Sequence, residues 1–329
     1  MSASRVLVVF LDGVGVGADD PGVNPLAAAR TPALDALLEG TRPVASKLPW
    51  QGARASARGL DATLGVDGLP QSGTGQAALL TGVNAAERFG RHFGPYTPTA
   101  LRPLVERENL LAVAAGAGET VAFANAYPAD LIALAGSGGR LPLPLRSAVV
   151  IAALGAGVLV RHERELASGD AIASEITHAG WREGLGRTEI PEISAEQAGR
   201  NLAAIANRHR LTLFAHYATD GAGHLQDLNA GVDAWQRVDA FLSGLLERLD
   251  PGVLLLVASD HGNLEDVRAQ HTRNPALCLV TGSGHAALAE RLGSLTDVAP
   301  ALLDVLGIES PQTSRRARDA AASPRKNAP

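Results

Sequence analysis

The sequence predicts an α/β three-layer sandwich with a mostly parallel central sheet, plus a small inserted α+β cap domain. Three observations support this fold class. Three long apolar runs, at 6–12, 211–220 and 253–260, each end in an aspartate. Helical patterns separate the later runs. Through the middle third of the chain, Pro, Gly and Arg become frequent and the apolar stretches become short. Continuous apolar runs of this length are typical of strands that are buried on both faces of a parallel sheet.

The N-terminal part of the chain has the pattern of a strand, a long loop and a helix. The strand is expected at 5–11, and the loop at 12–30 is rich in Gly, Asp and Pro. A Thr-Pro pair opens the helix at 31–38, because Thr is a good N-cap and Pro suits the first helical position. A second helix is expected at 73–81, with Ser72 at its N-terminus.

The middle of the chain differs in composition from the two ends. Between 94 and 199, Pro, Gly and Arg are frequent and apolar stretches are short, which predicts an inserted cap domain. The catalytic core is therefore expected to comprise 1–93 and 200–311. Its later part has the order helix 195–209, strand from 211, helix 233–249, strand from 253, strand 275–281 and helix 295–306. The tail at 312–329 lacks hydrophobic periodicity and is expected to be disordered.

Composition excludes several classes of function. Hydrophobic residues make up 46% of the 329 residues and charged residues 19%, as in ordinary globular proteins. A net charge of −5 offers no electrostatic footprint for nucleic acid or for an anionic membrane. The single cysteine, Cys278, excludes an internal disulfide and indicates a reducing compartment. The first residues lead directly into a short apolar run, which is neither a signal peptide nor a membrane span, so a cytoplasmic location is expected.

Acids and imidazoles gather at the ends of the apolar runs and on the loops that follow them. Ligands of parallel sheets collect outside the carboxyl ends of the strands. Several acids and imidazoles brought together there would repel one another or be poorly solvated without a cation between them. Each piece alone is a common turn or helical pair, but together they predict a metal site. The candidate ligands are Asp12, Asp220, His224, Asp260, His261 and His271.

Ser72 is the candidate nucleophile. A hydroxyl at the start of a helix is usually an N-cap. The same position also collects free backbone N–H groups and the positive end of the helix dipole, which suits an anion. A divalent cation in contact with the oxygen would promote loss of its proton and make it a nucleophile. Thr74, two residues further on, is the competing candidate.

Together these residues resemble the alkaline phosphatase superfamily, in particular the branch of cofactor-independent phosphoglycerate mutase and phosphopentomutase. The resemblance covers about 5–35, 66–84 and 195–310, and its pieces stand in the family order. The pieces are the strand-end Asp12, the nucleophile Ser72, the D-x-x-x-H pair Asp220 and His224, the D-H-G-N segment at 260–263 and the H-T-x-N-P segment at 271–275.

The resemblance implies two divalent metal ions. One would be held by Asp220, His224 and His271, and the other by Asp12, Ser72, Asp260 and His261. Carboxylate, imidazole and hydroxyl ligands suit Mn²⁺ or Zn²⁺ better than Ca²⁺, and Mg²⁺ is a further candidate.

The resemblance also implies phosphoryl transfer on a small phosphorylated metabolite, with a phosphoserine intermediate on Ser72. Water would then release phosphate, as in a phosphomonoesterase, or a second substrate hydroxyl would receive the group, as in a phosphomutase. The segment at 94–199 occupies the place of the mutase cap but is shorter than the cap of phosphoglycerate mutase, which favours hydrolysis. Alternatives are a phosphodiesterase or phosphonate hydrolase using the same site, and a non-catalytic metal-binding protein that retains the fold.

Three residues just after the nucleophile helix are candidates for substrate binding. Arg88, Arg91 and His92 are well placed to bind a phosphate or a carboxylate, although they could equally be surface charges. Gln76 stands where phosphoglycerate mutase has a His shortly after its nucleophile, which argues against the same substrate.

Overall fold

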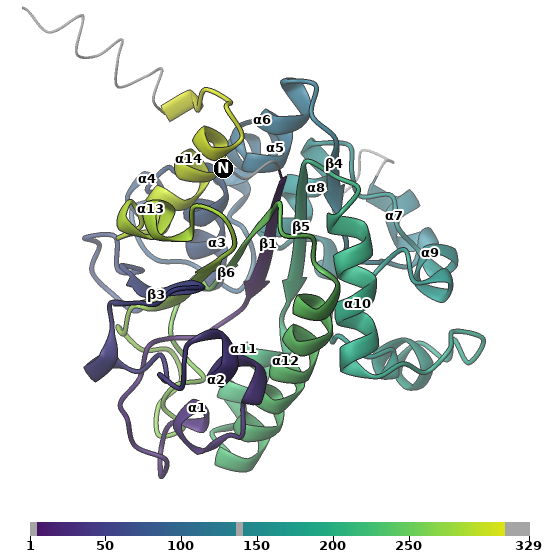
Figure 1. The fold of residues 1–329 in the computed structure, drawn as a ribbon. Helices are drawn as coiled ribbons and strands as arrows, with labels where there is room; N and C mark the ends of the chain where they lie inside the picture. The colour runs from purple at the N-terminus through teal and green to yellow at the C-terminus, as the bar shows by residue number, and fades with distance from the viewer. Residues whose placement is uncertain (1–4, 136–140, 313–329) are drawn as a thin grey trace, which may run out of the picture.

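A seven-stranded sheet forms the centre of the computed structural model, which describes residues 5–135 and 141–312 (Figure 1). The strands are β1 (Arg5–Leu11), β2 (Trp50–Gln51), β3 (Ala55–Leu60), β4 (Val121–Phe123), β5 (Leu211–His216), β6 (Val253–Ala258) and β7 (Ala276–Thr281). Their order across the sheet is β2-β3-β7-β6-β1-β5-β4.

The sheet is mixed, whereas the sequence predicted a mostly parallel one. The strands β6, β1, β5 and β4 are parallel neighbours, but β7 pairs antiparallel with both β6 and β3, and β2 pairs antiparallel with β3. Two parallel strands that follow each other in the chain need a crossover connection between them, which is usually a helix. The segment 259–275 between β6 and β7 contains no helix, so the chain returns in the opposite direction.

Helices cover both faces of the sheet, as the sandwich prediction requires. They are α1 (Pro25–Ala28), α2 (Pro32–Leu37), α3 (Ser72–Thr81), α4 (Ala85–Phe89), α5 (Arg102–Glu108), α6 (Leu110–Gly116), α7 (Ala129–Ala135), α8 (Ala148–Gly155), α9 (Glu163–Ser168), α10 (Ala195–Ala206), α11 (Ala218–Leu225), α12 (Leu228–Arg248), α13 (His285–Glu290) and α14 (Leu295–Val305). No helix among these described residues is both long and apolar enough to cross a membrane.

The central strand β1 shows how the two layers are built. Its side chains alternate between the faces, as the period of a strand requires. Val8 and Phe10 pack with α3, α5, α8 and α14 in one apolar cluster. Leu7 and Val9 pack with α1, α2, α10 and α12 in the other. Both faces of β1 are therefore buried, which explains why its sequence is continuously apolar.

The middle segment, expected as a separate cap at 94–199, contributes directly to the core. Its strand β4 extends the main sheet beside β5, and its helix α8 packs in the same cluster as α3. A small separate apolar cluster forms only further along, from Ala126, Leu166, Ala171, Ala173, Trp181 and Ile190. An inserted cap domain is thus not confirmed, because composition does not reveal what a short apolar run packs against. The expected disordered tail lies outside the described residues, apart from its first residue.

Candidate metal centre and nucleophile

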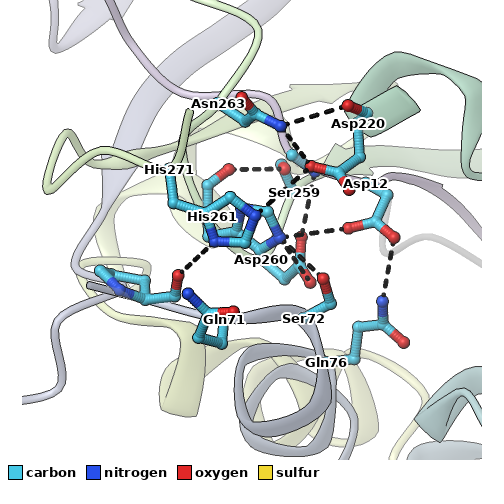
Figure 2. A network of polar contacts seen from close by, with 12 residues as sticks. Asp12, Gln71, Ser72, Gln76, Asp220, Ser259, Asp260, His261, Asn263 and His271 are labelled. Carbon is cyan, nitrogen blue, oxygen red and sulfur yellow. Dashed lines mark hydrogen bonds and ion pairs between the residues drawn. The ribbon is translucent and has the colours of Figure 1, made fainter. Parts of the chain in front are cut away.

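Three neighbouring strands bring the predicted ligands to one edge of the sheet. The parallel strands β1, β5 and β6 end side by side, and a ligand-bearing segment follows each of them. Asp12 comes directly after β1, and α11 carries Asp220 shortly after β5. Asp260 follows β6 by two residues. Figure 2 shows these side chains converging with Ser72 and His271 on one polar cluster.

Two groups within this cluster have the geometry of metal sites. The ligand atoms of Asp220, His224 and His271 lie within 4.8 Å of one another, as do those of Asp12, Asp220 and His261. Asp220 belongs to both groups. Its Oδ2 lies 3.2 Å from His224 Nε2, and its Oδ1 lies 3.8 Å from His271 Nε2. The first group has the same membership as one ligand set implied by the sequence.

The second group continues toward Ser72. His261 Nε2 lies 3.3 Å from Asp12 Oδ1, 3.8 Å from Asp260 Oδ2 and 3.0 Å from Ser72 Oγ. The ring of His261 stacks on that of His271, with their centroids 4.2 Å apart. All seven side chains that the sequence predicted as ligands are therefore connected through short contacts.

The charge balance of the cluster indicates where a cation fits. Asp260 and His261 are fully buried, and Asp12 is only 6% exposed. The His261 imidazole faces both Asp12 Oδ1, at 3.3 Å, and Asp260 Oδ2, at 3.8 Å. Two buried carboxylates that share one imidazole are incompletely compensated in charge, so their oxygens are suited to coordinate a divalent cation. Carboxylate and imidazole donors are the ligands that Mn²⁺ and Zn²⁺ use in proteins.

The pKa values of Asp260 and His261 reflect the same excess of buried carboxylate charge. Burial, together with the Asp12 carboxylate, raises the pKa of Asp260 well above its usual range. Burial alone would lower the pKa of His261, but the Asp260 and Asp12 carboxylates outweigh it and raise that pKa to about 10. The two carboxylates thus favour positive charge at this position of the cluster.

The start of α3 positions Ser72 beside this cluster. Gln71 occupies the N-cap, so the Ser72 hydroxyl is not used for capping and meets His261 instead. Two glycines allow this close approach: a Cβ on Gly75 would lie 2.8 Å from Asp260 O, and one on Gly73 would lie 2.2 Å from Tyr96 O. No other residue type would fit there without moving the backbone.

Thr74, the competing nucleophile, is engaged elsewhere. Its hydroxyl donates to the Phe93 carbonyl at 3.4 Å and accepts the Phe93 N–H at 3.1 Å. Its side chain is fully buried. Its hydrogen bonds therefore hold the loop after α4 against α3, while Ser72 contacts the ligand cluster.

Glu265 is a residue that the sequence reasoning missed. Its Oε2 accepts N–H groups from Gly15 at 3.0 Å and Asn263 at 2.7 Å, and its Oε1 accepts hydrogen bonds from Thr272 Oγ1 and from Asn274 Nδ2 at 3.0 Å. These partners lie on the loops that carry Asp12, His261 and His271. The available signal was an acidic residue two positions after the D-H-G-N segment.

The predicted substrate-binding residues lie close to Ser72 in sequence but outside the cavity that contains it. Arg91 and His92 line a neighbouring hollow of about 540 Å³ with Gln71. His92 Nε2 contacts the carbonyls of residues 63 and 66, and the Arg91 guanidinium lies within 6 Å of two Phe rings. Arg88 is exposed on α4. Their binding role stays a prediction.

Ser72 opens into a smaller cavity of about 200 Å³. Asp12 and Asp220 line it beside Ser72, together with Gln76, whose Nε2 donates to Asp12 Oδ2 at 3.2 Å. The remaining wall includes the hydroxyl-bearing residues Tyr96, Ser147 and Tyr217. A small molecule bound here would touch the nucleophile and two of the candidate metal ligands at once.

Some known proteins are similar to part of this sequence, and others are similar in fold. Residues 183–310 match the model of the family described as the Metalloenzyme superfamily. Two similar relatives are 2,3-bisphosphoglycerate-independent phosphoglycerate mutases. The one from Desulforudis audaxviator is 35% identical over 129 residues, which is 37% of this chain and 25% of the relative. The one from Halobacterium salinarum is 38% identical over 134 residues, which is 37% of this chain and 26% of the relative.

The chain therefore spans about a quarter of the length of the curated relatives it matches. The solved structure of the PH0037 protein from Pyrococcus horikoshii has a similar fold, with a TM-score of 0.55 and 14% identity over 93% of this chain and 98% of that one. The lipoteichoic acid synthase LtaP from Listeria monocytogenes gives a TM-score of 0.50 and 10% identity over 94% and 73%.

The matched segment contains the candidate ligands that follow β5 and β6, and the structure adds Asp12 and Ser72 from the N-terminal part. Sequence, fold and ligand geometry agree. Over residues 183–310 the chain is thus similar to the Metalloenzyme superfamily and to 2,3-bisphosphoglycerate-independent phosphoglycerate mutases.

Proposed function

We propose that this protein is a metal-dependent enzyme that transfers the phosphoryl group of a small phosphomonoester through a phosphoserine on Ser72. One observation carries the proposal: the Ser72 hydroxyl lies 3.0 Å from His261 Nε2, inside a cluster of acids and imidazoles suited to divalent cations. The nucleophile would then lie next to the metal ions that bind the phosphoryl oxygens.

Two sets of side chains would hold the metals. Asp220, His224 and His271 would be one set. Asp12, Ser72 and Asp260, which all lie close to His261 Nε2, would form the other set together with His261. Divalent ions bound there would neutralise phosphoryl oxygens and lower the pKa of the Ser72 hydroxyl.

The chain itself supplies positioning. Ser72 Oγ, after losing its proton to solvent, would form a bond to phosphorus while the bond from phosphorus to the alcohol oxygen breaks on the opposite side. The alcohol would leave after taking up a proton from solvent. The first turn of α3 directs the positive end of its dipole toward the same region, which stabilises a bound phosphoryl group. Gln76 holds Asp12 in place through its 3.2 Å hydrogen bond. Phosphoryl transfer needs mainly orientation and charge stabilisation, so these groups would act together with the bound metals.

The fate of the phosphoserine decides between a phosphatase and a mutase. Water attacking phosphorus would release inorganic phosphate, whereas a second substrate hydroxyl would yield an isomer. We expect hydrolysis, because β4 and α8 pack into the core and leave less of the middle segment to shield the intermediate from water.

The test compares p-nitrophenyl phosphate hydrolysis by the wild type and by Ser72→Ala, with Mn²⁺, Zn²⁺ or Mg²⁺. We expect a metal-dependent wild type and a loss of about a thousandfold or more in kcat for the variant, because the nucleophile is removed. Ser168→Ala, an exposed serine on α9, serves as the control and should match the wild type. Acid quenching during turnover should trap phosphate on the peptide that contains Ser72.

Three outcomes would contradict the proposal. Equal rates for the wild type and Ser72→Ala would exclude Ser72 as the nucleophile. A metal-loaded wild type without activity would favour a non-catalytic metal-binding protein. Faster hydrolysis of bis(p-nitrophenyl) phosphate than of the monoester would favour a phosphodiesterase.

A further inference from the structure

The cavity that contains Ser72 has two chemically different walls. Asp12, Asp220 and Ser72 form the wall on the side of the ligand cluster. Ser147 and Tyr217 stand among the remaining lining residues, one at the N-cap of α8 and the other directly after β5. A phosphoryl group held against the first wall would leave the alcohol portion of its ester facing the second.

The second wall carries a pair of connected hydroxyls. Ser147 Oγ and Tyr217 OH lie 3.1 Å apart, and Tyr217 also shares a hydrogen bond with Tyr127. Burial raises the pKa of Tyr217 well above its usual range, so this hydroxyl stays protonated and uncharged. A hydroxyl pair of this kind can both donate to and accept from a hydroxyl on a ligand.

The charges around the cavity argue against a second anionic group on the substrate. Two carboxylates line it, and none of its described lining residues is Arg or Lys. Two arginines, Arg102 and Arg146, belong to a neighbouring cavity beyond Tyr96. Arg146 Nε is already engaged with the Leu141 carbonyl at 2.6 Å. A carboxylate on the alcohol portion of the ester would lie against the second wall, where no described lining residue offers a positive charge to pair with it.

We propose that the substrate is the phosphomonoester of a small, uncharged polyhydroxylated alcohol, with a hydroxyl of that alcohol bound by Ser147 and Tyr217. This inference rests on the proposed function and specifies its substrate class. The cavity volume of about 200 Å³ is below the range of roughly 300–1,000 Å³ that is usual for drug-sized ligands, so the alcohol portion is expected to be small.

The test measures kcat/KM for three substrates of similar size on the metal-loaded protein. Glycerol 3-phosphate carries two free hydroxyls, propyl phosphate carries none, and 3-phosphoglycerate carries a carboxylate. We expect glycerol 3-phosphate to exceed each of the others by about tenfold or more, because a site that binds a hydroxyl discriminates against analogues that lack it.

Variants then assign the preference to the hydroxyl pair. Tyr217→Phe and Ser147→Ala should each lower the ratio of kcat/KM for glycerol 3-phosphate over propyl phosphate by about three- to tenfold, the usual effect of one neutral hydrogen bond. A smaller fraction of folded enzyme would lower kcat/KM for both substrates by the same factor, so it does not change this ratio. Tyr127→Phe removes a hydroxyl of the same network that does not line the cavity, and it should leave the ratio within about twofold.

The outcomes separate this inference from the proposed function. Turnover of p-nitrophenyl phosphate without preference among the three substrates would overturn the substrate class alone. A preference for 3-phosphoglycerate that Arg146→Gln abolishes would overturn it too, since the anionic group would then reach the neighbouring cavity. Failure to turn over any of these esters, p-nitrophenyl phosphate included, would overturn both proposals.

Discussion

At the scale of single residues, Glu265 connects loops that are far apart in sequence. It accepts hydrogen bonds from the loop after β1, from its own loop and from the segment after His271. It is only 3% exposed, so water cannot easily replace these bonds. Residues that orient ligands in this way commonly change metal affinity by 10–100-fold when mutated, according to typical values.

We expect Glu265→Gln to weaken Mn²⁺ binding by about tenfold or more, measured by isothermal titration calorimetry. The amide nitrogen of Gln donates where an oxygen of Glu accepts, so at least one buried N–H or hydroxyl loses its acceptor. The apoprotein should also lose about 1–3 kcal/mol of unfolding free energy. Glu247→Gln, which affects an exposed ion pair with Arg200 on the far helices, is the matched control. Unchanged Mn²⁺ affinity in Glu265→Gln would refute this role.

The seven candidate ligands could be predicted from sequence because each one stands in a short local pattern at the end of an apolar run. Glu265 could not, because its role depends on partners such as Gly15, 250 positions away in the chain. The surroundings of Thr74 likewise depend on the loop after α4, whose Phe93 backbone binds its hydroxyl. Local patterns identify residue types that are suited to chemistry, whereas only packing shows what each hydroxyl or carboxylate meets.

At the scale of elements, α10 and α12 pack closely against each other over one face of the sheet. A Cβ on Gly244 of α12 would lie 2.0 Å from the carbonyl oxygen of Glu196, and one on Gly199 of α10 would lie 2.1 Å from that of Phe241. Each clash involves backbone, which cannot move aside as a flexible side chain can. The two glycines therefore set the distance between the helices.

We expect Gly244→Ala to destabilise the protein by about 1–3 kcal/mol or more in urea unfolding, because the added methyl group forces the helices apart. Gly116→Ala is the matched control, since no described atom lies within 4 Å of a Cβ at this helical position. That control should be neutral or up to about 1 kcal/mol stabilising, because Ala restricts the unfolded chain. Equal stabilities for the two variants would contradict this account of the helix contact.

Element types were easier to predict than their pairing. The strands β1, β5 and β6 and the helices that flank them were expected from apolar runs and helical patterns. The antiparallel direction of β7 depends on the absence of a helix in the described segment 259–275, and the place of β4 depends on its pairing with β5. The direction of β7 and the place of β4 therefore cannot be read from the residues of these two strands alone.

At the scale of the whole molecule, the ligand cluster joins segments from both ends of the chain. Asp12 and Ser72 come from the N-terminal part, and Asp220, Asp260 and His271 come from the C-terminal part. A metal bound between them would stabilise the folded chain, because the unfolded chain does not hold these side chains together. Binding to the folded state alone adds about 2.7 kcal/mol when free metal is a hundredfold above its dissociation constant.

We therefore expect Mn²⁺ or Zn²⁺ to raise the thermal unfolding midpoint of the protein and EDTA to reverse the rise. Differential scanning calorimetry at several metal concentrations provides the measurement. His271→Ala should largely lose the metal-dependent rise. Asp266→Asn is the control, because this acid of the same loop pairs with Arg268 outside the ligand groups. A midpoint that does not respond to metal, or an equal response in His271→Ala, would refute the predicted metal linkage.

By itself, the sequence determined the α/β class, the positions of the main strands and the set of side chains that could bind metal, because these depend on short-range patterns of apolar and polar residues. Only the tertiary structure decided that the sheet is mixed, that β4 and α8 belong to the core, and that Asp220 is shared by two ligand groups. The same holds for the hydroxyl pair of Ser147 and Tyr217 beside Ser72. The physical reason is that each of these features is a contact between distant segments, whose free energy depends on burial and charge that no single segment contains.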